Sequence, residues 1–181
     1  MKQIEIRLSG SGGQGLILGG RLLMHTLMLA GYYVAQSQSY EPTSRGGLSR
    51  SDLVASESPV EFPLATELDM IIVLDQVAVE PSRSLIRPGG LVFSDSQRVT
   101  QPLEGEFNSF EIPFHQIARE QGNPRGANIV ALGLLVELGR FATQENLQTA
   151  IEKLTPQRFR SVNSTVAQAG KQWARDLDLK S

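Results

Sequence analysis

A glycine-rich segment near the amino terminus has residue types and a spacing that could do chemistry. Its glycines fall on the G-x-G-x-x-G pattern in the run Gly10-Ser11-Gly12-Gly13-Gln14-Gly15, directly after the apolar-rich run 4–8. Glycine permits positive φ angles and close backbone approach, and a helix that follows presents unpaired N–H groups and the positive end of its dipole. The segment therefore predicts a socket for a phosphate or another anion.

The same pattern is typical of dinucleotide-binding proteins, and the next 25 or so residues test that interpretation. A nicotinamide site usually carries an Asp or Glu about 20 residues after the glycines, where it binds the ribose hydroxyls. Residues 33–39 contain no acidic residue and no arginine that could bind a 2′-phosphate. No Lys-Ser or Lys-Thr pair follows Gly15, so the segment is not a P-loop either. A nicotinamide dehydrogenase is disfavoured.

A second polar segment, residues 36–52, carries Arg45 and Arg50 beside the pair Gly46-Gly47. A guanidinium next to two glycines can present a fork of donors with exposed backbone N–H groups nearby. Such a group suits a phosphate, a carboxylate or an acidic side chain of a partner. The alternative is an ordinary exposed loop with solvated arginines.

Asn128 and the two histidines are further polar candidates. Asn128 follows Gly126-Ala127 at the start of an apolar run, so it is predicted to cap the helix that begins there. The functional alternative is that Arg125 and Asn128 face the mouth of the glycine loop. His25 and His115 are too few for a metal site and are predicted to be surface or interface residues, so no metal is expected.

The composition limits the class of protein. The chain has 181 residues, 40% of them hydrophobic and 20% charged, with a net charge of −2, which is typical of one globular domain over 1–181. We expect no nucleic-acid surface, secretion signal or membrane span, and hence a cytoplasmic protein. The absence of cysteine excludes an iron–sulfur cluster held by thiolates of this chain.

The candidate residues must be positioned by alternating strands and helices. The hydrophobic pattern predicts strands over 4–8, 32–35, 49–55, 69–75, 91–94 and 110–113, the third of them half-exposed, with a loop over 37–47 and a turn over 87–90. Helices are predicted over 16–30, 77–84, 114–121, 128–138, 144–154 and 161–177. This order indicates an α/β fold: a single Rossmann-like, doubly wound domain with a mostly parallel sheet flanked by helices and a helical C-terminal part. The glycine loop would then lie at the carboxyl ends of the strands.

The first predicted helix is apolar on more than one side. Apolar residues occupy most positions from 15 to 30, which is wider than one amphipathic stripe. The sheet can cover one side of this helix. A partner subunit or other helices of the same chain could cover the rest, and the pattern alone leaves both open.

Four motif blocks in a fixed order resemble a known family. The blocks are Gly10-Ser11-Gly12-Gly13-Gln14-Gly15; Gln38-Ser39-Tyr40 with Arg45-Gly46-Gly47; Arg87-Pro88-Gly89-Gly90; and Gly122-Asn123-Pro124-Arg125-Gly126-Ala127-Asn128 running into Ala131-Leu132-Gly133. They resemble the gamma subunit of the 2-oxoacid:ferredoxin oxidoreductases, most closely the stand-alone subunit of the 2-oxoglutarate type. Glu41 stands where the family usually has Gly, and Thr43 where it usually has Glu.

The resemblance implies a subunit that does not perform the chemistry alone. Enzymes of this family decarboxylate a 2-oxoacid on thiamine diphosphate, pass electrons through iron–sulfur clusters to ferredoxin and release an acyl-CoA. Thiamine and the clusters are expected on alpha, beta and ferredoxin-like delta subunits, and this chain is expected to have a structural or coenzyme-A-docking role. The isolated chain could form a homodimer. An indolepyruvate-type oxidoreductase subunit and a free-standing module that binds coenzyme A or a nucleotide are the alternatives.

The glycine loop, the second polar segment and Asn128 together supply the candidate cofactor-binding residues. No catalytic residue is expected in this chain alone. They are Gly10, Ser11, Gly12, Gly13, Gln14, Gly15, Arg45, Gly46, Gly47 and Asn128.

Overall fold

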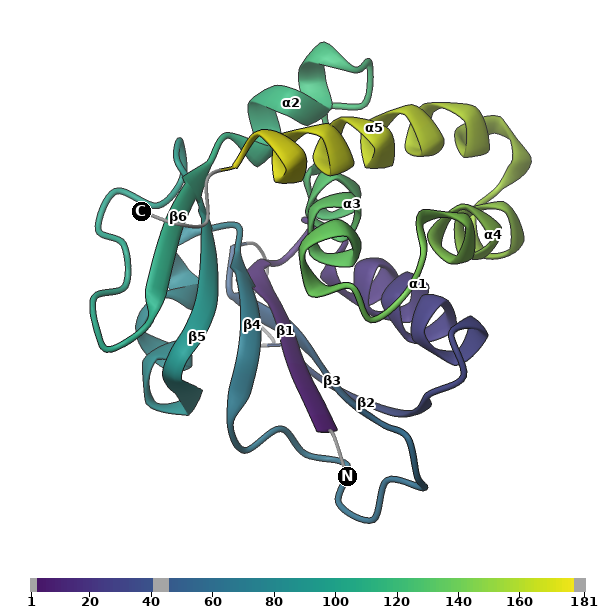
Figure 1. The fold of residues 1–181 in the computed structure, drawn as a ribbon. Coiled ribbons are helices and arrows are strands. Elements are labelled where there is room, and N and C mark those ends of the chain that lie inside the picture. Colours follow the sequence, from purple (N-terminus) through teal and green to yellow (C-terminus); the bar gives the residue numbers. More distant parts are fainter. Residues whose placement is uncertain (1–2, 41–45, 178–181) are drawn as a thin grey trace.

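One strand and one helix open the chain, five further strands follow with two short 3-10 helices among them, and the rest of the chain is helical (Figure 1). The structure is a computed structural model that describes residues 3–40 and 46–177. Its elements are β1 (Gln3–Ser11), α1 (Leu16–Leu29), β2 (Tyr33–Tyr40), β3 (Leu48–Ser56), β4 (Leu68–Val73), the 3-10 helices η1 (Gln76–Ala78) and η2 (Glu80–Leu85), β5 (Ile86–Asp95), β6 (Asn108–Ile112), α2 (Phe114–Glu120), α3 (Ala127–Gly139), α4 (Gln144–Leu154) and α5 (Gln157–Asp176).

The strands form one six-stranded sheet in the order β2-β3-β1-β4-β5-β6. The pairs β1–β4, β4–β5 and β5–β6 are parallel, whereas β3 is antiparallel to both β1 and β2. β1, α1 and β2 therefore form a parallel crossover unit with β3 inserted between its strands. The predicted α/β fold with a mostly parallel sheet is confirmed; β4 lies in the centre of the sheet and β6 at one edge.

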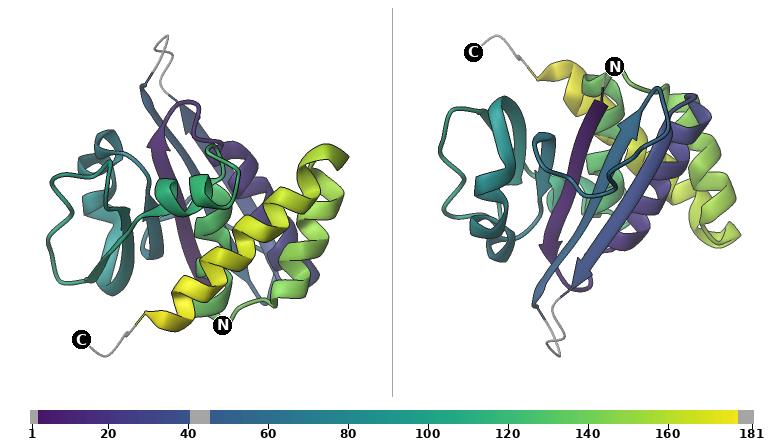
Figure 2. Two further views of the ribbon diagram at one scale, coloured as in Figure 1. Left: turned by 90° about the horizontal axis from the view of Figure 1, so that it is seen from above. Right: turned by 90° about the horizontal axis from the view of Figure 1, so that it is seen from below.

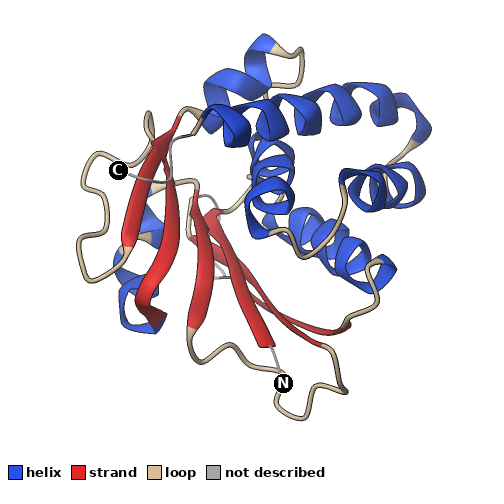
Figure 3. Ribbon diagram, in the orientation of Figure 1, coloured by secondary structure: helices blue, strands red, loops and turns tan. Residues whose placement is uncertain are grey.

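The two faces of the sheet pack against different layers (Figures 2 and 3). Ile4, Ile6 and Leu8 of β1 join the large core beneath α1, α3 and α4. On the other face, Val73 and Val92 pack with residues of η1 and of the segment between β5 and β6. The alternation of side chains along a strand produces this division.

No helix in the described ranges has the length and apolar character needed to cross a membrane.

Three features of the sheet differ from the sequence prediction. β2 continues to Tyr40, because its polar residues pair with β3 along their whole length, so a loop over 37–40 is wrong. β3 is almost entirely buried rather than half-exposed, since it lies inside the sheet. The predicted turn over 87–90 lies within β5, where the pairing with β4 shifts register between Leu68 and Met70. Pairing and burial override local propensity at these positions.

Some apolar side chains of α1 are buried in the interior of the protein, and others are exposed at its surface. Leu16, Leu22, Leu23 and Leu27 are buried, with α3 and α4 of the same chain covering the helix beside the sheet. Its exposed apolar side chains gather towards its two ends: Ile17, Leu18, Met28 and Leu29. Other elements of this chain therefore cover most of the helix, whereas its exposed ends are open to contact with another subunit.

Candidate functional site

The glycine loop connects the end of β1 to the start of α1, in the strand–turn–helix context that the sequence predicts. Gly13 and Gly15 have φ angles of 95° and 70°, which favour glycine. Gly15 is the N-cap of α1 without a side-chain cap, and the first turn of α1 carries no acidic residue. Among the described residues, the backbone N–H groups of Gly13 and Gly15 have no recorded acceptor. The loop thus keeps donors and the helix dipole available for an anion.

Gln14 holds the loop from the inside. Its Oε1 accepts a hydrogen bond of 2.8 Å from the Ser11 N–H, and its Nε2 donates to the Leu74 carbonyl at 3.0 Å. A Cβ on Gly10 would lie 2.1 Å from Gln14 Oε1, so any larger residue here would displace the Gln14 side chain from its present position. Gly10 and Gln14 therefore shape the loop, while the open donors belong to its outer residues.

A buried carboxylate and an imidazole support Gln14 from below. Asp95, at the end of β5, is fully buried and accepts from both the backbone N–H and the Nδ1 of His115, at 2.9 and 2.8 Å. The Nε2 of His115 lies 3.3 Å from the Nε2 of Gln14. His115 is partly buried, with 17% of its side chain exposed, and it supports the loop in addition to being the surface or interface residue that the sequence predicts. Its sequence neighbours gave no signal of this contact, because Asp95 and Gln14 are distant in the chain.

The hydrogen-bond pattern assigns the state of His115. The Gln14 amide donates to Leu74, and its second hydrogen can reach His115 only if Nε2 is unprotonated. Nδ1 then carries the proton and donates to Asp95. Burial of Asp95 by itself would raise its pKa, but the hydrogen bonds from the side chain and backbone of His115 and from the Gln97 N–H outweigh burial and lower the pKa.

Asn128 connects the loop to α3. The N-cap of α3 is Gly126, so the prediction that Asn128 caps this helix is wrong. Its Nδ2 instead donates to the Gly15 carbonyl at 2.8 Å, and a Cβ on Gly15 would lie 2.9 Å from the same nitrogen. Asn128 thus anchors the start of α1 from a helix that is far away in sequence, and it lies beneath the loop.

Charges around the loop offset one another. The Ser11 hydroxyl donates to Asp75 Oδ2 at 3.2 Å, and that oxygen also lies 3.5 Å from the guanidinium of Arg98. An anion beside Ser11 would meet the Asp75 carboxylate partly neutralised by Arg98. The open face near Gly12 and Gly13 is the more favourable position, since a Cβ on Gly12 would meet only the Gly47 carbonyl, at 3.8 Å.

The second polar segment touches the glycine loop through its backbone. The Gly12 N–H donates to the Gly47 carbonyl at 2.9 Å, which joins the start of β3 to the loop. Gly46 has a φ of 79°, and a Cβ there would have nothing within 4 Å. Arg45 lies outside the described residues.

Together these features define an α/β protein with a glycine loop at the carboxyl end of β1, where the N–H groups of Gly13 and Gly15 have no acceptor among the described residues. Comparison with known proteins gives the family. The model of the pyruvate ferredoxin/flavodoxin oxidoreductase family matches residues 5–173. The 2-oxoglutarate synthase subunit KorC of Methanocaldococcus jannaschii is 37% identical over 177 residues, covering 96% of this chain and 95% of the relative.

Solved structures agree with the sequence comparison. The gamma subunit of the keto/oxoacid ferredoxin oxidoreductase from Geobacter sulfurreducens superposes with a TM-score of 0.85 at 32% identity, covering 96% of this chain and 99% of that one. The 2-oxoglutarate:ferredoxin oxidoreductase of Magnetococcus marinus shares the fold, with a TM-score of 0.86 at 23% identity; the match spans 98% of this chain but 32% of that one. The chain belongs to the pyruvate ferredoxin/flavodoxin oxidoreductase family, as a gamma-type subunit of a 2-oxoacid:ferredoxin oxidoreductase.

Proposed function

We propose that this chain is the coenzyme-A-docking subunit of a 2-oxoglutarate-type oxidoreductase, and that its glycine loop binds the coenzyme's diphosphate. The observation that carries the proposal is the uncapped start of α1, where the N–H groups of Gly13 and Gly15 face no acceptor among the described residues. A helix start of this kind binds phosphate groups without a cationic side chain. The candidate contact residues remain 10–15, Arg45, Gly46 and Gly47, with Asn128 holding the loop from below.

The relatives support the choice of ligand and substrate. The Magnetococcus marinus enzyme was solved with 2-oxoglutarate, coenzyme A and succinyl-CoA bound, and the Methanocaldococcus jannaschii relative is a 2-oxoglutarate synthase subunit. In this proposal the whole chain, 1–181, acts as one gamma-type domain in the cytoplasm. Alpha, beta and delta subunits supply thiamine diphosphate and the iron–sulfur clusters, because this chain has no cysteine thiolate to hold a cluster. Ferredoxin takes the electrons from the complex.

Gly12→Val tests the docking role. The Gly12 Cβ position is open and its φ is not in the left-handed region, so the variant should fold and assemble while its side chain obstructs the loop. Isothermal titration of coenzyme A into the assembled complex should show at least about tenfold weaker binding than wild type, the size expected if the valine side chain keeps the diphosphate from one charge-assisted hydrogen bond of the loop. Thr165→Val, on the exposed side of α5, is the control. Unchanged affinity in a fully assembled Gly12→Val complex would leave the loop with a packing role only.

Packing against a partner subunit is the competing role for the same loop. The exposed Ile17 and Leu18 on the first turn of α1 lie next to the glycines and favour a protein contact there. In that case Gly12→Val would prevent recovery of the other subunits rather than weaken coenzyme A binding. An indolepyruvate-type complex would be distinguished by its preferred 2-oxoacid, and a free-standing module by affinity for coenzyme A in the isolated chain.

A further inference from the structure

A second pocket lies on the sheet face opposite α1. It has a volume of about 210 Å³. Its walls are Arg7 of β1, Arg50 and Asp52 of β3, Ser37, Gln38 and Ser39 of β2, and the apolar residues Leu64, Ala65 and Leu85. The volume is below the range of about 300–1,000 Å³ that is usual for drug-sized ligands, so a small molecule is the appropriate occupant.

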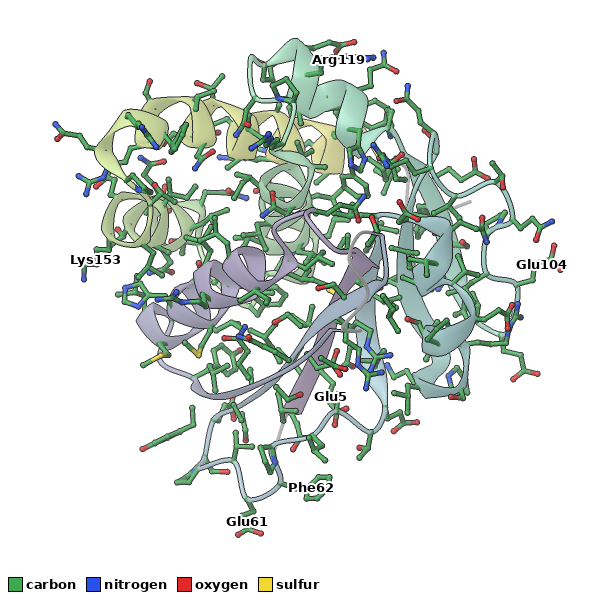
Figure 4. All side chains as sticks on the ribbon, turned by 180° about the vertical axis from the view of Figure 1, so that it is seen from behind. Glu5, Glu61, Phe62, Glu104, Arg119 and Lys153 are labelled. Carbon is green, nitrogen blue, oxygen red and sulfur yellow. The ribbon has the colours of Figure 1, made fainter. Side chains whose placement is uncertain are left out.

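The loop between β3 and β4 forms the apolar wall and is fixed in place. Seen from behind in Figure 4, Glu5 lies on the sheet and Phe62 lies on this loop. The buried carboxylate of Glu5 accepts hydrogen bonds from the backbone N–H groups of Thr66 and Glu67, at 2.5 and 2.7 Å. Leu64 and Ala65 directly precede these two residues, so the hydrogen bonds to Glu5 hold the end of this loop against the sheet beside the pocket.

The charges of Arg7 and Asp52 cancel within the pocket. Arg7 is 1% exposed, and its Nε and Nη2 donate to the two carboxylate oxygens of Asp52 at 2.7 and 2.8 Å. This bidentate geometry satisfies both oxygens of Asp52. Asp52 is thus paired with Arg7, and no contact of Asp52 with Arg50 is found among the described residues.

Arg50 is the remaining cation of the pocket. It lies on the same face of β3 as Asp52 and is directly opposite Ser39 of β2 and Ser9 of β1. Its side chain is partly buried, yet no hydrogen bond or ion pair of Arg50 is recorded with any part of the chain that the structure describes. Withdrawing a guanidinium from water without a counter-charge is unfavourable, which an anion in the pocket would correct.

We infer that this pocket binds a small organic carboxylate with a short apolar chain. The guanidinium of Arg50 would receive the carboxylate, the hydroxyls of Ser37 and Ser39 would complete its hydrogen bonds, and Leu64, Ala65 and Leu85 would contact the apolar part. This site is separate from the glycine loop and does not depend on its role. It requires only residues of this chain.

Titration of the full-length chain with butanoate, followed by amide NMR, tests the inference. Butanoate should shift the backbone signals of Ser37, Ser39 and Arg50 in a saturable way, whereas butan-1-ol, which has no charge, should not. Inorganic phosphate, which has no apolar part, should bind more weakly than butanoate. Arg50→Gln should weaken butanoate binding by at least about tenfold, the effect of losing one charge-assisted hydrogen bond.

Two control variants separate this site from the other features of the chain. Arg119→Gln removes an exposed arginine of α2 and should leave butanoate binding unchanged. Gly12→Val should also leave it unchanged, because the glycine loop is not part of the pocket. Equal binding of butanoate by wild type and Arg50→Gln, or an equal response to butan-1-ol, would overturn the inference. A preserved amide spectrum in Arg50→Gln verifies that the variant is folded.

Discussion

At the scale of single residues, the glycine loop depends on one of its own side chains, Gln14, and on two that come from elsewhere in the sequence, His115 and Asn128. Gln14 fills the space inside the loop, His115 orients Gln14, and Asn128 holds the Gly15 carbonyl. Asp95 completes the chain of hydrogen bonds behind His115. The conformation of the loop is therefore set by a buried polar network, in which each unpaired group would cost the free energy of its desolvation.

We expect the proton of the His115 imidazole that the hydrogen bonds require to lie on Nδ1, because Nδ1 faces Asp95 and Nε2 faces the amide donor of Gln14. Two-dimensional NMR of the ¹⁵N-labelled imidazole should show a protonated Nδ1 and an unprotonated Nε2. In Gln14→Leu, which removes the donor, this constraint on Nε2 disappears. A wild-type spectrum with the proton on Nε2 would contradict the assigned network.

Asp95 should make the free energy of unfolding of the chain depend on pH in the acidic range. Its pKa is lower in the folded state, so its stabilising effect is fully present above the ordinary value of about 3.9 and is lost as the pH falls through the folded pKa. Urea unfolding should show Asp95→Asn to be about 1–3 kcal/mol less stable than wild type at pH 7. The difference should shrink below about pH 4. Glu111→Gln, an exposed change on β6, is the control, and a difference that stays constant down to pH 3 would contradict the prediction.

Asn128→Ala should destabilise the chain by about 1–2 kcal/mol through the lost hydrogen bond to Gly15, although Asn128 does not cap its own helix. Backbone amide exchange in the first turn of α1 should accelerate more than exchange in α3. Asn128→Asp, which replaces the donor by an acceptor, should be at least as damaging. Faster exchange confined to the start of α3 would restore the capping interpretation.

At the scale of elements, close helix packing places α3 beneath the loop. α3 is buried on nearly all sides and lies across α5, which allows very close contact at two glycines. A Cβ on Gly133 would lie 2.0 Å from the Ala167 carbonyl, and a Cβ on Gly170 would lie 2.0 Å from the Val130 carbonyl. The two backbones can approach because these positions lack side chains, and this contact fixes α3, which carries Asn128.

Gly170→Ala should therefore destabilise the chain by about 1–3 kcal/mol, although alanine has the higher helix propensity by about 1 kcal/mol. Gln168→Ala, an exposed change two residues away on α5, should have little effect. Thermal and urea unfolding of both variants measure the contrast. A stabilised Gly170→Ala would show that α3 and α5 are farther apart than the structure indicates.

At the scale of the whole molecule, the exposed apolar residues of α1 are the positions that we propose as contacts with other subunits. Ile17 and Leu18 lie beside the glycine loop, and Met28 is 53% exposed at the far end of the same helix. Such residues in a subunit of a larger enzyme are natural contact positions. They also offer a surface for self-association of the isolated chain.

Leu18→Glu should leave the stability of the isolated chain within about 0.5 kcal/mol of wild type, as is usual for surface substitutions. It should reduce recovery of the alpha and beta subunits when they are co-expressed with this chain and purified through it. Met28→Glu tests the other end of the helix, and analytical ultracentrifugation of the isolated chain detects a homodimer at either position. Full recovery of partners with both variants would show that α1 is not a contact surface.

The sequence by itself predicted the α/β class, nearly all helices and strands, the family and the strand–turn–helix setting of the glycine loop, because these depend on local pattern and spacing. The tertiary structure alone revealed that β2 continues to Tyr40, that Asn128 anchors Gly15 and that Asp95 and His115 support Gln14. The hydrogen bonds of Asn128, Asp95 and His115 join residues between 20 and 113 positions apart. Local propensity carries no information about such pairs, since packing of the sheet against α1 and α3 brings them together.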